Sequence, residues 1–383
     1  MNIFLIGLPG CGKTTVGRKL AQLMNLPFID LDELIENDAD MTIPEIFSRF
    51  GESGFRERER DVLNKHSLVS DSIISTGGGI VKTKGNIETM RTRGVVVFLD
   101  RVPDEQNVDW TNRPARAPMD ELVRERRPLY LSAADLIFPL GCDFCVIGDP
   151  IGHTLSPVLH SAIFKSVGIS STYGVCNVSR ETLQVFTQLA KICGMRGFNV
   201  TIPHKQNIIP LLDEVSEDAE CANAVNTVCV KNEKLYGYNT DVDGLKTALK
   251  ARRNGVGYRG QRVLLLGDGG AASGILYKAR QDGAEITVAS RKNGGIIDEF
   301  VRADLSKIDL LINATPLGML GNDKNFANFG FLDFLPKHSL VCDLIYNPLE
   351  TTLMSEAKKR NLATLNGLTM LVSQAIIADT IFF

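Results

Sequence analysis

Two glycine-rich segments have the composition of phosphate-binding loops. Gly7–Thr14 (GLPGCGKT) fits G-x-x-x-x-G-K-[ST], the P-loop of nucleoside triphosphate enzymes. Gly267–Ala272 (GDGGAA) follows an apolar stretch and precedes a predicted helix, as a dinucleotide-binding turn does. A chain that binds both a triphosphate and a dinucleotide is predicted to carry two enzymes that act in series.

The first motif predicts an ATP and Mg²⁺ site. Backbone amides of the loop and of the next helix would hold phosphate oxygens. Lys13 would reach the β- and γ-phosphates, and the Thr14 hydroxyl would bind Mg²⁺. The predicted nucleotide-binding residues are Gly7, Gly10, Gly12, Lys13, Thr14 and Thr15.

A lysine and an aspartate elsewhere in the chain could perform acid–base chemistry. Lys205 follows an apolar strand in the segment 198–205 (FNVTIPHK), and Asp241 comes at the predicted start of a helix. A paired lysine and aspartate can share a proton with a carbonyl or hydroxyl between them, as a carbon that accepts hydride requires. Taken alone, the two residues would be read as a surface ion pair and a helix N-cap.

Alternating strands and helices must position these groups. The predicted strands of the N-terminal part are 2–6, 27–31, 72–75, 95–99 and 135–138, with a helix over 13–24. They predict a doubly wound α/β fold with a parallel sheet. The predicted domains are 1–141, then 142–250 completed by a C-terminal helix over 367–383, and a Rossmann-type unit over 251–366.

Composition excludes several classes of function. The 383 residues are 44% hydrophobic and 23% charged, with a net charge of -3, so a nucleic-acid partner is not expected. No signal peptide is recognised, and the apolar stretch 368–383 is interrupted by Ser373, Gln374 and Asp379. We therefore expect a cytoplasmic protein with no membrane contact and reduced thiols, and we read Cys142-x-x-Cys145 as structural. A homo-oligomer is compatible with this composition.

Four further motifs accompany the P-loop. They are 30–32 (DLD), 51–59 (GESGFRERE), 76–79 (TGGG) and 125–130 (ERRPLY). With the P-loop, in this order, they resemble shikimate kinase over residues 1 to about 138. The resemblance departs at 113–116 (RPAR), in the lid, and at the final kinase helix, which has no counterpart before the next domain begins.

This resemblance implies specific roles. Asp32 would bind and activate the substrate hydroxyl, Asp30 would lie near Mg²⁺, and Arg113 would be the lid arginine. The carboxylate of shikimate would be held by Arg56 and Arg126 beside Gly77, Gly78 and Gly79. Singly, Asp30 could be a helix cap, Arg56 part of a solvated charge run and Arg126 a surface cation.

The C-terminal part carries its own ordered motifs. They are 148–160 (GDPIGHTLSPVLH), 224–227 (AVNT), 239–244 (NTDVDG), 313–319 (NATPLGM), 343–351 (DLIYNPLET) and 366–374 (NGLTMLVSQ). They resemble shikimate dehydrogenase over residues 142–383. The resemblance implies that Lys205 and Asp241 are catalytic. Substrate would be bound by Asp241, Thr154, Ser156, Asn199, Thr201, Asn226, Tyr346 and Gln374. No catalytic role is implied for His153, His160 or His204.

The second strand of the Rossmann-type unit indicates the cofactor. Ser290-Arg291-Lys292 follows it, where an NAD site would have an acidic residue, and two cations suit the 2′-phosphate of NADP. The remaining predicted NADP(H) residues are Gly267, Gly269, Gly270, Ala271, Asn313, Thr315 and Met319. Thr154, where shikimate-preferring members usually have serine, leaves room for a quinate side activity.

Together the two resemblances predict a bifunctional enzyme of aromatic amino-acid biosynthesis. The C-terminal half would reduce 3-dehydroshikimate with NADPH, and the N-terminal half would phosphorylate the shikimate formed. Two alternatives stay open. The N-terminal half could be an inactive, nucleotide-binding regulatory domain, or the C-terminal half could be an NAD-dependent quinate dehydrogenase, which Arg291 and Lys292 disfavour.

Overall fold

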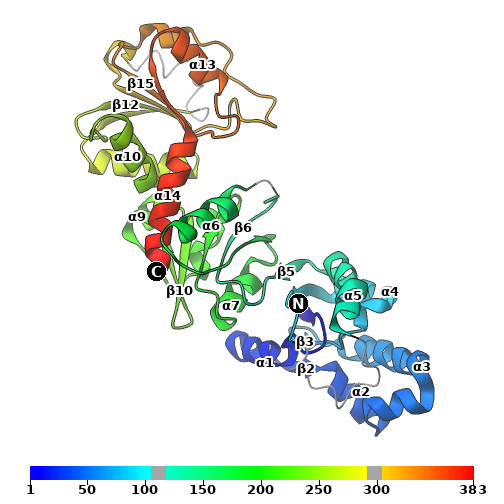
Figure 1. Ribbon diagram of the computed structural model, residues 1–383. Coiled ribbons are helices and arrows are strands. Elements are labelled where there is room, and N and C mark those ends of the chain that lie inside the picture. The colour runs from blue at the N-terminus through cyan, green and yellow to red at the C-terminus, as the bar shows by residue number, and fades with distance from the viewer. Residues whose placement is uncertain (105–117, 153, 291–303) are drawn as a thin grey trace. The chain divides into compact units, whose positions relative to one another are not determined.

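The computed structural model describes residues 1–104, 118–152, 154–290 and 304–383. These residues form two compact units. The first comprises 1–154, 172–196 and 230–233, and the second comprises 155–171, 197–229 and 234–383 (Figure 1). Within the described ranges, no helix has the length and apolar content that crossing a membrane requires.

The N-terminal sheet is parallel, with strand order β2-β3-β1-β4-β5. Its strands are β1 (Asn2–Ile6), β2 (Phe28–Asp30), β3 (Ile73–Ser75), β4 (Gly94–Leu99) and β5 (Leu136–Phe138). The helical segments are α1 (Lys13–Met24), α2 (Leu31–Ala39), α3 (Ile43–His66), η1 (Ile80–Lys82), α4 (Lys84–Arg93) and α5 (Met119–Ala133). The five strands and the first helix predicted from the sequence are confirmed to within one or two residues at their ends.

Parallel pairing brings the polar ends of these strands together. Every residue of β1 is buried, as expected for a strand covered on both faces. The register aligns Leu5 with Ser75, and Ser75 with Asp30. The P-loop after β1, Asp30 and the glycine segment after β3 therefore share the carboxyl edge of the sheet.

One long helix is interrupted by a glycine. The helix α3 spans Ile43–His66 and contains Gly51. Gly51 has φ 69° and ψ -178°, which interrupts the helical geometry. Glycine adopts this backbone conformation without the penalty of a Cβ, so α3 is kinked there, and the segment carrying Arg56 follows the kink.

The second sheet has strand order β7-β6-β8-β10-β11-β9. Its strands are β6 (Phe144–Gly148), β7 (Tyr173–Asn177), β8 (Gly197–Val200), β9 (Glu214–Val215), β10 (Thr227–Lys231) and β11 (Lys234–Tyr238). The helical segments of this region are α6 (Ser156–Ser166), α7 (Leu183–Ile192), α8 (His204–Asn207), η3 (Ile209–Leu211) and α9 (Glu217–Ala222). The ends of β8 and β10 position Asn199 and Asn226 near one another.

The third sheet is parallel, with strand order β13-β12-β14-β15-β16. Its strands are β12 (Arg262–Leu266), β13 (Glu285–Ala289), β14 (Leu310–Asn313), β15 (Leu340–Asp343) and β16 (Ala363–Leu365). Its helical segments are α10 (Thr240–Arg252), α11 (Gly270–Gln281), η5 (Leu305–Lys307), η6 (Gly330–Phe334) and α13 (Thr352–Lys359). Two apolar clusters pack on it, one containing Leu265 and Ile275 and the other containing Leu264 and Leu353.

The last helix, α14 (Gly367–Phe382), follows β16 but packs on earlier parts of the second unit. It contacts both α10 and α6 (Figure 1). Gly244 on α10 lets the two backbones approach closely, because an added Cβ would lie 2.8 Å from the Gln374 nitrogen. Gln374 therefore lies directly against the helix that carries Asp241.

Candidate active sites

The P-loop has the geometry of a nucleotide site. Gly10 and Gly12 adopt φ values of 77° and 103°, which favour glycine. Lys13 is buried, and its Nζ donates to the carbonyl oxygens of Gly7 at 2.9 Å and Leu8 at 3.0 Å. The ammonium is thus held over the loop, at the start of α1, where a phosphate would meet it.

Thr14 and Asp30 are joined directly. The Thr14 hydroxyl donates to Asp30 Oδ2 at 2.8 Å, while Asp30 Oδ1 accepts from the Asp32 backbone N–H at 3.1 Å. Asp30 is therefore both the N-cap of α2 and the partner of the predicted Mg²⁺-binding hydroxyl. A helix-capping role and a position near Mg²⁺ are therefore both compatible with the geometry of Asp30.

The three glycines after β3 each leave room for a different neighbour. A Cβ on Gly77 would lie 2.7 Å from Asp32 Oδ1, and one on Gly79 would lie 2.3 Å from Arg56 Nη2. A Cβ on Gly78 would lie 2.9 Å from the Pro9 ring. The segment thus brings the P-loop, Asp32 and Arg56 into contact with one stretch of backbone.

The two predicted carboxylate-binding arginines have buried, unused donors. Arg126 Nη1 donates to the Gly78 carbonyl at 3.2 Å, and Arg56 Nη1 donates to Glu59 Oε2 at 2.8 Å. The buried Nε of each arginine has no hydrogen-bond acceptor among the described residues. An acceptor is expected for these two donors, because buried N–H groups are normally satisfied.

Glu59 and Tyr130 belong to this site, although the sequence assigned them no role. Burial raises the pKa of Glu59, and the charge of Arg56 opposes that rise. Tyr130 is fully buried, its hydroxyl donates to the Gly78 carbonyl, and burial raises its pKa. Both lie within the quoted motifs, so their spacing from Arg56 and Arg126 was the signal that could have identified them.

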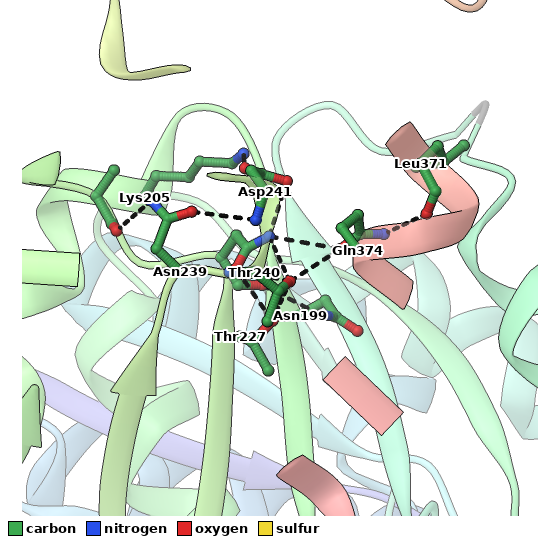
Figure 2. A network of polar contacts seen from close by, with 10 residues as sticks. Asn199, Lys205, Thr227, Asn239, Thr240, Asp241, Leu371 and Gln374 are labelled. Carbon is green, nitrogen blue, oxygen red and sulfur yellow. Dashed lines mark hydrogen bonds and ion pairs between the residues drawn. The ribbon is translucent and has the colours of Figure 1, made fainter. Parts of the chain in front are cut away.

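In the second unit, Lys205 and Asp241 meet. Lys205 Nζ lies 2.5 Å from Asp241 Oδ2, and both side chains are partly accessible (Figure 2). Asp241 lies in the first turn of α10, whose N-cap Asn239 accepts from the Asp241 backbone N–H at 3.1 Å. The other carboxylate oxygen, Oδ1, accepts from Asn226 Nδ2 at 2.8 Å. Asp241 is therefore oriented by neighbours on both of its oxygens.

A buried polar network surrounds this pair. Thr240 Oγ1 donates to Gln374 Oε1 at 3.2 Å, and the Thr240 backbone N–H donates to Asn226 Oδ1 at 2.8 Å. Asn199 Nδ2 donates to Thr227 Oγ1 at 3.1 Å (Figure 2). The sequence predicted Asn199, Asn226 and Gln374 as substrate-binding residues and assigned no role to Thr227, Asn239 or Thr240. Thr227 adjoins Asn226 in the motif 224–227, and Asn239 and Thr240 adjoin Asp241 in the motif 239–244.

The third sheet gathers the predicted cofactor residues at its carboxyl edge. Leu266, which precedes the glycine turn, is in register with Ala289 and with Asn313. Gly267 has φ 109°, and a Cβ there would lie 3.1 Å from the Ala314 carbonyl oxygen. Gly269 is the N-cap of α11, so Gly270 and Ala271 open that helix with free backbone N–H groups toward the edge.

A buried carboxylate orients this edge. Asp343 accepts from Asn313 Nδ2 at 3.0 Å, from Thr351 Oγ1 at 2.7 Å and from the Ile345 backbone N–H at 3.1 Å. Asn313 Oδ1 in turn accepts from Thr315 Oγ1 at 2.7 Å. Asp343 and Thr351 were quoted in a motif without a role, and the structure links them to two predicted cofactor residues.

For the other predicted residues, the structure gives a location in the fold. Thr154 lies in the first unit, Ser156 opens α6 in the second, and Thr201 follows β8. Gly7 lies in the P-loop, Thr15 lies on α1, and Ser290 directly follows β13, whereas Met319 and Tyr346 lie in loops after β14 and β15. Arg113, Arg291, Lys292 and His153 lie outside the described residues. All eight cysteines are free thiols, and within the described ranges no group of three or more His, Cys, Asp or Glu could hold a metal ion.

Comparison with known proteins places this geometry in a family. Residues 9–140 match the family model for shikimate kinase, and residues 146–228 match that for the shikimate dehydrogenase substrate binding domain. A shikimate dehydrogenase (NADP(+)) of Methanococcus maripaludis is 38% identical over 253 residues, covering 62% of this chain and 90% of the relative. The chain belongs to the shikimate dehydrogenase family.

Solved structures agree. A shikimate dehydrogenase in complex with NADP⁺ superposes with a TM-score of 0.57 at 36% identity, covering 64% of this chain and 93% of the other. The Thermus thermophilus enzyme in complex with NADP(H) and shikimate gives a TM-score of 0.55 at 30% identity, covering 63% and 93%. The predicted fusion of a shikimate kinase domain with a shikimate dehydrogenase, and its α/β fold class, are confirmed.

Proposed function

We propose that this chain is a bifunctional enzyme. Its dehydrogenase half reduces 3-dehydroshikimate to shikimate with NADPH, and its kinase domain phosphorylates that shikimate with ATP and Mg²⁺. The product of the first reaction is the acceptor of the second. The observation that carries the dehydrogenase assignment is the contact of Lys205 with Asp241 at 2.5 Å, beside Asn226 and Gln374.

In this proposal, NADPH supplies the hydride when bound. Lys205 donates a hydrogen bond to the substrate carbonyl oxygen and gives it a proton as negative charge develops there. Asp241 holds the ammonium in place, and in the reverse direction the hydroxyl proton returns to Lys205. Asn226 fixes the Asp241 carboxylate through its 2.8 Å hydrogen bond.

The cofactor assignment rests on the chain's own residues. Gly269 and Gly270 bring backbone N–H groups to the edge where a pyrophosphate would bind, and an added Cβ on Gly269 would meet nothing within 4 Å. The Methanococcus maripaludis relative is named for NADP(+), which agrees with the cations predicted at Arg291 and Lys292.

For the kinase half, the unused Nε donors of Arg56 and Arg126 support binding of an anionic substrate. ATP would supply the phosphoryl group when bound. Lys13 would balance the charge of its phosphates, and Thr14 with Asp30 would hold Mg²⁺, which suits their oxygen ligands. Asp32, in contact with Gly77, would orient the substrate hydroxyl.

The dehydrogenase assignment is tested by NADPH oxidation with 3-dehydroshikimate. Lys205→Met should lower kcat by about 10²- to 10⁴-fold, the usual contribution of a positioned acid or base. Lys246→Met is a matched control. The Lys246 side chain is 25% exposed, against 27% for Lys205, and it also pairs with an aspartate, Asp282. Equal activity in the two variants would reject the catalytic role of Lys205.

The kinase assignment is tested by ADP release with ATP, Mg²⁺ and shikimate. Shikimate-dependent turnover that is lost in Lys13→Ala would support two consecutive activities. If the wild-type protein shows no turnover while it still reduces 3-dehydroshikimate, the kinase domain binds nucleotide without catalysis, and the regulatory alternative replaces the proposal.

A further inference from the structure

His160 and Asp379 are the two conspicuous polar residues of the dehydrogenase half that the proposed chemistry does not use. Asp379 interrupts the apolar sequence of α14, yet its residue surface is only 6% exposed. His160, in the middle of α6, is fully buried. A polar pair retained in an apolar environment calls for a physical reason, because burying charge or hydrogen-bonding groups is costly unless they are paired.

The structure joins these two residues. His160 Nδ1 lies 2.6 Å from Asp379 Oδ1, across 219 residues of sequence. Aromatic rings surround the contact: the His160 ring lies 6.2 Å from Phe164 and 6.4 Å from Phe382. The second carboxylate oxygen, Asp379 Oδ2, is buried and has no hydrogen-bond partner among the described residues. His160 is therefore the partner that compensates the buried carboxylate, with Nδ1–H donating.

Each helix of this contact also carries a predicted substrate-binding residue. Ser156 lies four residues before His160, so the two share a face of α6. Gln374 lies on α14, where its Oε1 accepts from Thr240 and Asn226. The contact between His160 and Asp379 therefore links the helix that carries Ser156 to the helix that carries Gln374.

The end of α14 is held by shape as well. A Cβ on Gly197 would lie 2.6 Å from the Phe382 ring, so the first residue of β8 is shaped to that side chain. Asn199 lies on the same short strand. Apolar packing of this kind resists separation of the surfaces but tolerates sliding, whereas a hydrogen bond between two buried groups selects one register.

We propose that His160 and Asp379 form a positioning pair for the substrate site of the dehydrogenase half. They set the register of α14 against α6, so that Gln374 and Ser156 can contact one substrate molecule together. This inference rests on the proposed reduction of 3-dehydroshikimate. It predicts an effect on substrate binding and none on cofactor binding.

The test compares two variants of Asp379 in the full-length protein. Asp379→Leu removes the acceptor and retains apolar volume, so we expect the KM for 3-dehydroshikimate to rise about tenfold or more, with the dissociation constant of NADPH unchanged within about twofold. Asp379→Asn keeps an acceptor for His160 Nδ1–H and should restore a KM close to that of the wild type. Lys246→Met is the control for loss of an interhelical ion pair that does not involve α14.

A second pair of variants guards against failure to fold. His160→Asn places an amide N–H close to the position of Nδ1, whereas His160→Leu does not. The KM for 3-dehydroshikimate should therefore rise in His160→Leu and stay closer to the wild-type value in His160→Asn. A lowered melting temperature with unchanged KM in Asp379→Leu and His160→Leu would overturn the inference, because it would show a purely structural role. An equal loss of NADPH affinity would also overturn it. A wild-type protein that fails to reduce 3-dehydroshikimate would instead reject the proposed function itself.

Discussion

At the scale of single residues, Asp343 illustrates how a side chain far from the chemistry can govern a site. It is fully buried and accepts hydrogen bonds from three donors, of which Asn313 and Thr351 are side chains. Burial raises the pKa of Asp343, and these donors oppose the rise. A deprotonated carboxylate is the species that can accept all three bonds, so it fixes which way the Asn313 amide points.

We expect Asp343→Asn to weaken NADPH binding about tenfold, because its amide N–H₂ would face another donor and leave a buried group unpaired. Titration of NADPH fluorescence measures this directly. The exposed Asp323→Asn in the same half serves as the control. Unchanged affinity in a folded Asp343→Asn protein would show that Asn313 is held by other means.

At the scale of elements, the sites lie where strands end and where glycines leave room for neighbouring side chains. The segment after β3 is the clearest case, because Gly77 and Gly79 contact Asp32 and Arg56 with no space for a Cβ. The kink at Gly51 in α3 belongs to the same arrangement, since the segment that follows it carries Arg56 to that backbone.

Gly79→Ala is expected to displace the Arg56 guanidinium and to raise the KM for shikimate about tenfold, a change of about 1.4 kcal/mol. Gly85→Ala is the matched control: Gly85 lies on α4, nothing stands within 4 Å of its added Cβ, and alanine favours the helix. Initial rates of ADP formation at varied shikimate would separate the two variants, and similar KM values would exclude close packing as the reason for Gly79.

The opposite edge of the third sheet contains an acid-sensitive contact. Burial alone would raise the pKa of Asp309, but hydrogen bonds from the Arg262 side chain and backbone and from His338 outweigh it and lower the pKa to about 2. A depressed carboxyl pKa adds stability above its ordinary value of about 3.9, and that stability is lost as the pH falls toward 2.

Asp309→Asn should therefore lower the free energy of unfolding at pH 7 by about 1 kcal/mol, a value reduced for solvent screening. The difference from the wild type should shrink between about pH 4 and pH 2. Urea unfolding at several pH values measures it. A difference that stays constant down to pH 2 would contradict the assigned pKa.

At the scale of the whole molecule, the two proposed ligand-binding functions reside on one chain of 383 residues. Each set of site residues lies within a single compact unit, apart from Thr154, which the first unit contains. Ligands of the two halves should therefore stabilise the protein by separate routes.

In calorimetry, NADP⁺ at about 100 times its dissociation constant should stabilise the fold that binds it by about 2.7 kcal/mol. This effect should persist in Lys13→Ala, while stabilisation by ATP and Mg²⁺ should be lost. If ATP stabilises Lys13→Ala and the wild type equally, Lys13 does not bind the phosphates, and the assignment of the P-loop would have to be revised.

The sequence by itself determined those features that short contiguous motifs encode. The P-loop, the dinucleotide turn, the strands that precede them and the family of both halves follow from contiguous motifs, since such chemistry needs few residues at short spacing. The roles assigned to individual site residues stay predictions, including those of Arg113, Arg291 and Lys292. The sequence could not decide between a helix-capping and a functional role for Asp30, because a helix cap and a partner of Thr14 require the same carboxylate.

Only the tertiary structure decided which distant residues meet. Lys205 and Asp241 are 36 residues apart, Asn226 and Gln374 are 148 apart, and His160 and Asp379 are 219 apart. The apolar residues of 368–383 predicted a helix that completes the domain 142–250, but they could not say which helices of that domain it contacts. Burial then changes the meaning of a residue: Asp379, an interruption in the sequence, becomes the partner of a buried histidine, because low solvent access makes an unpaired carboxylate costly.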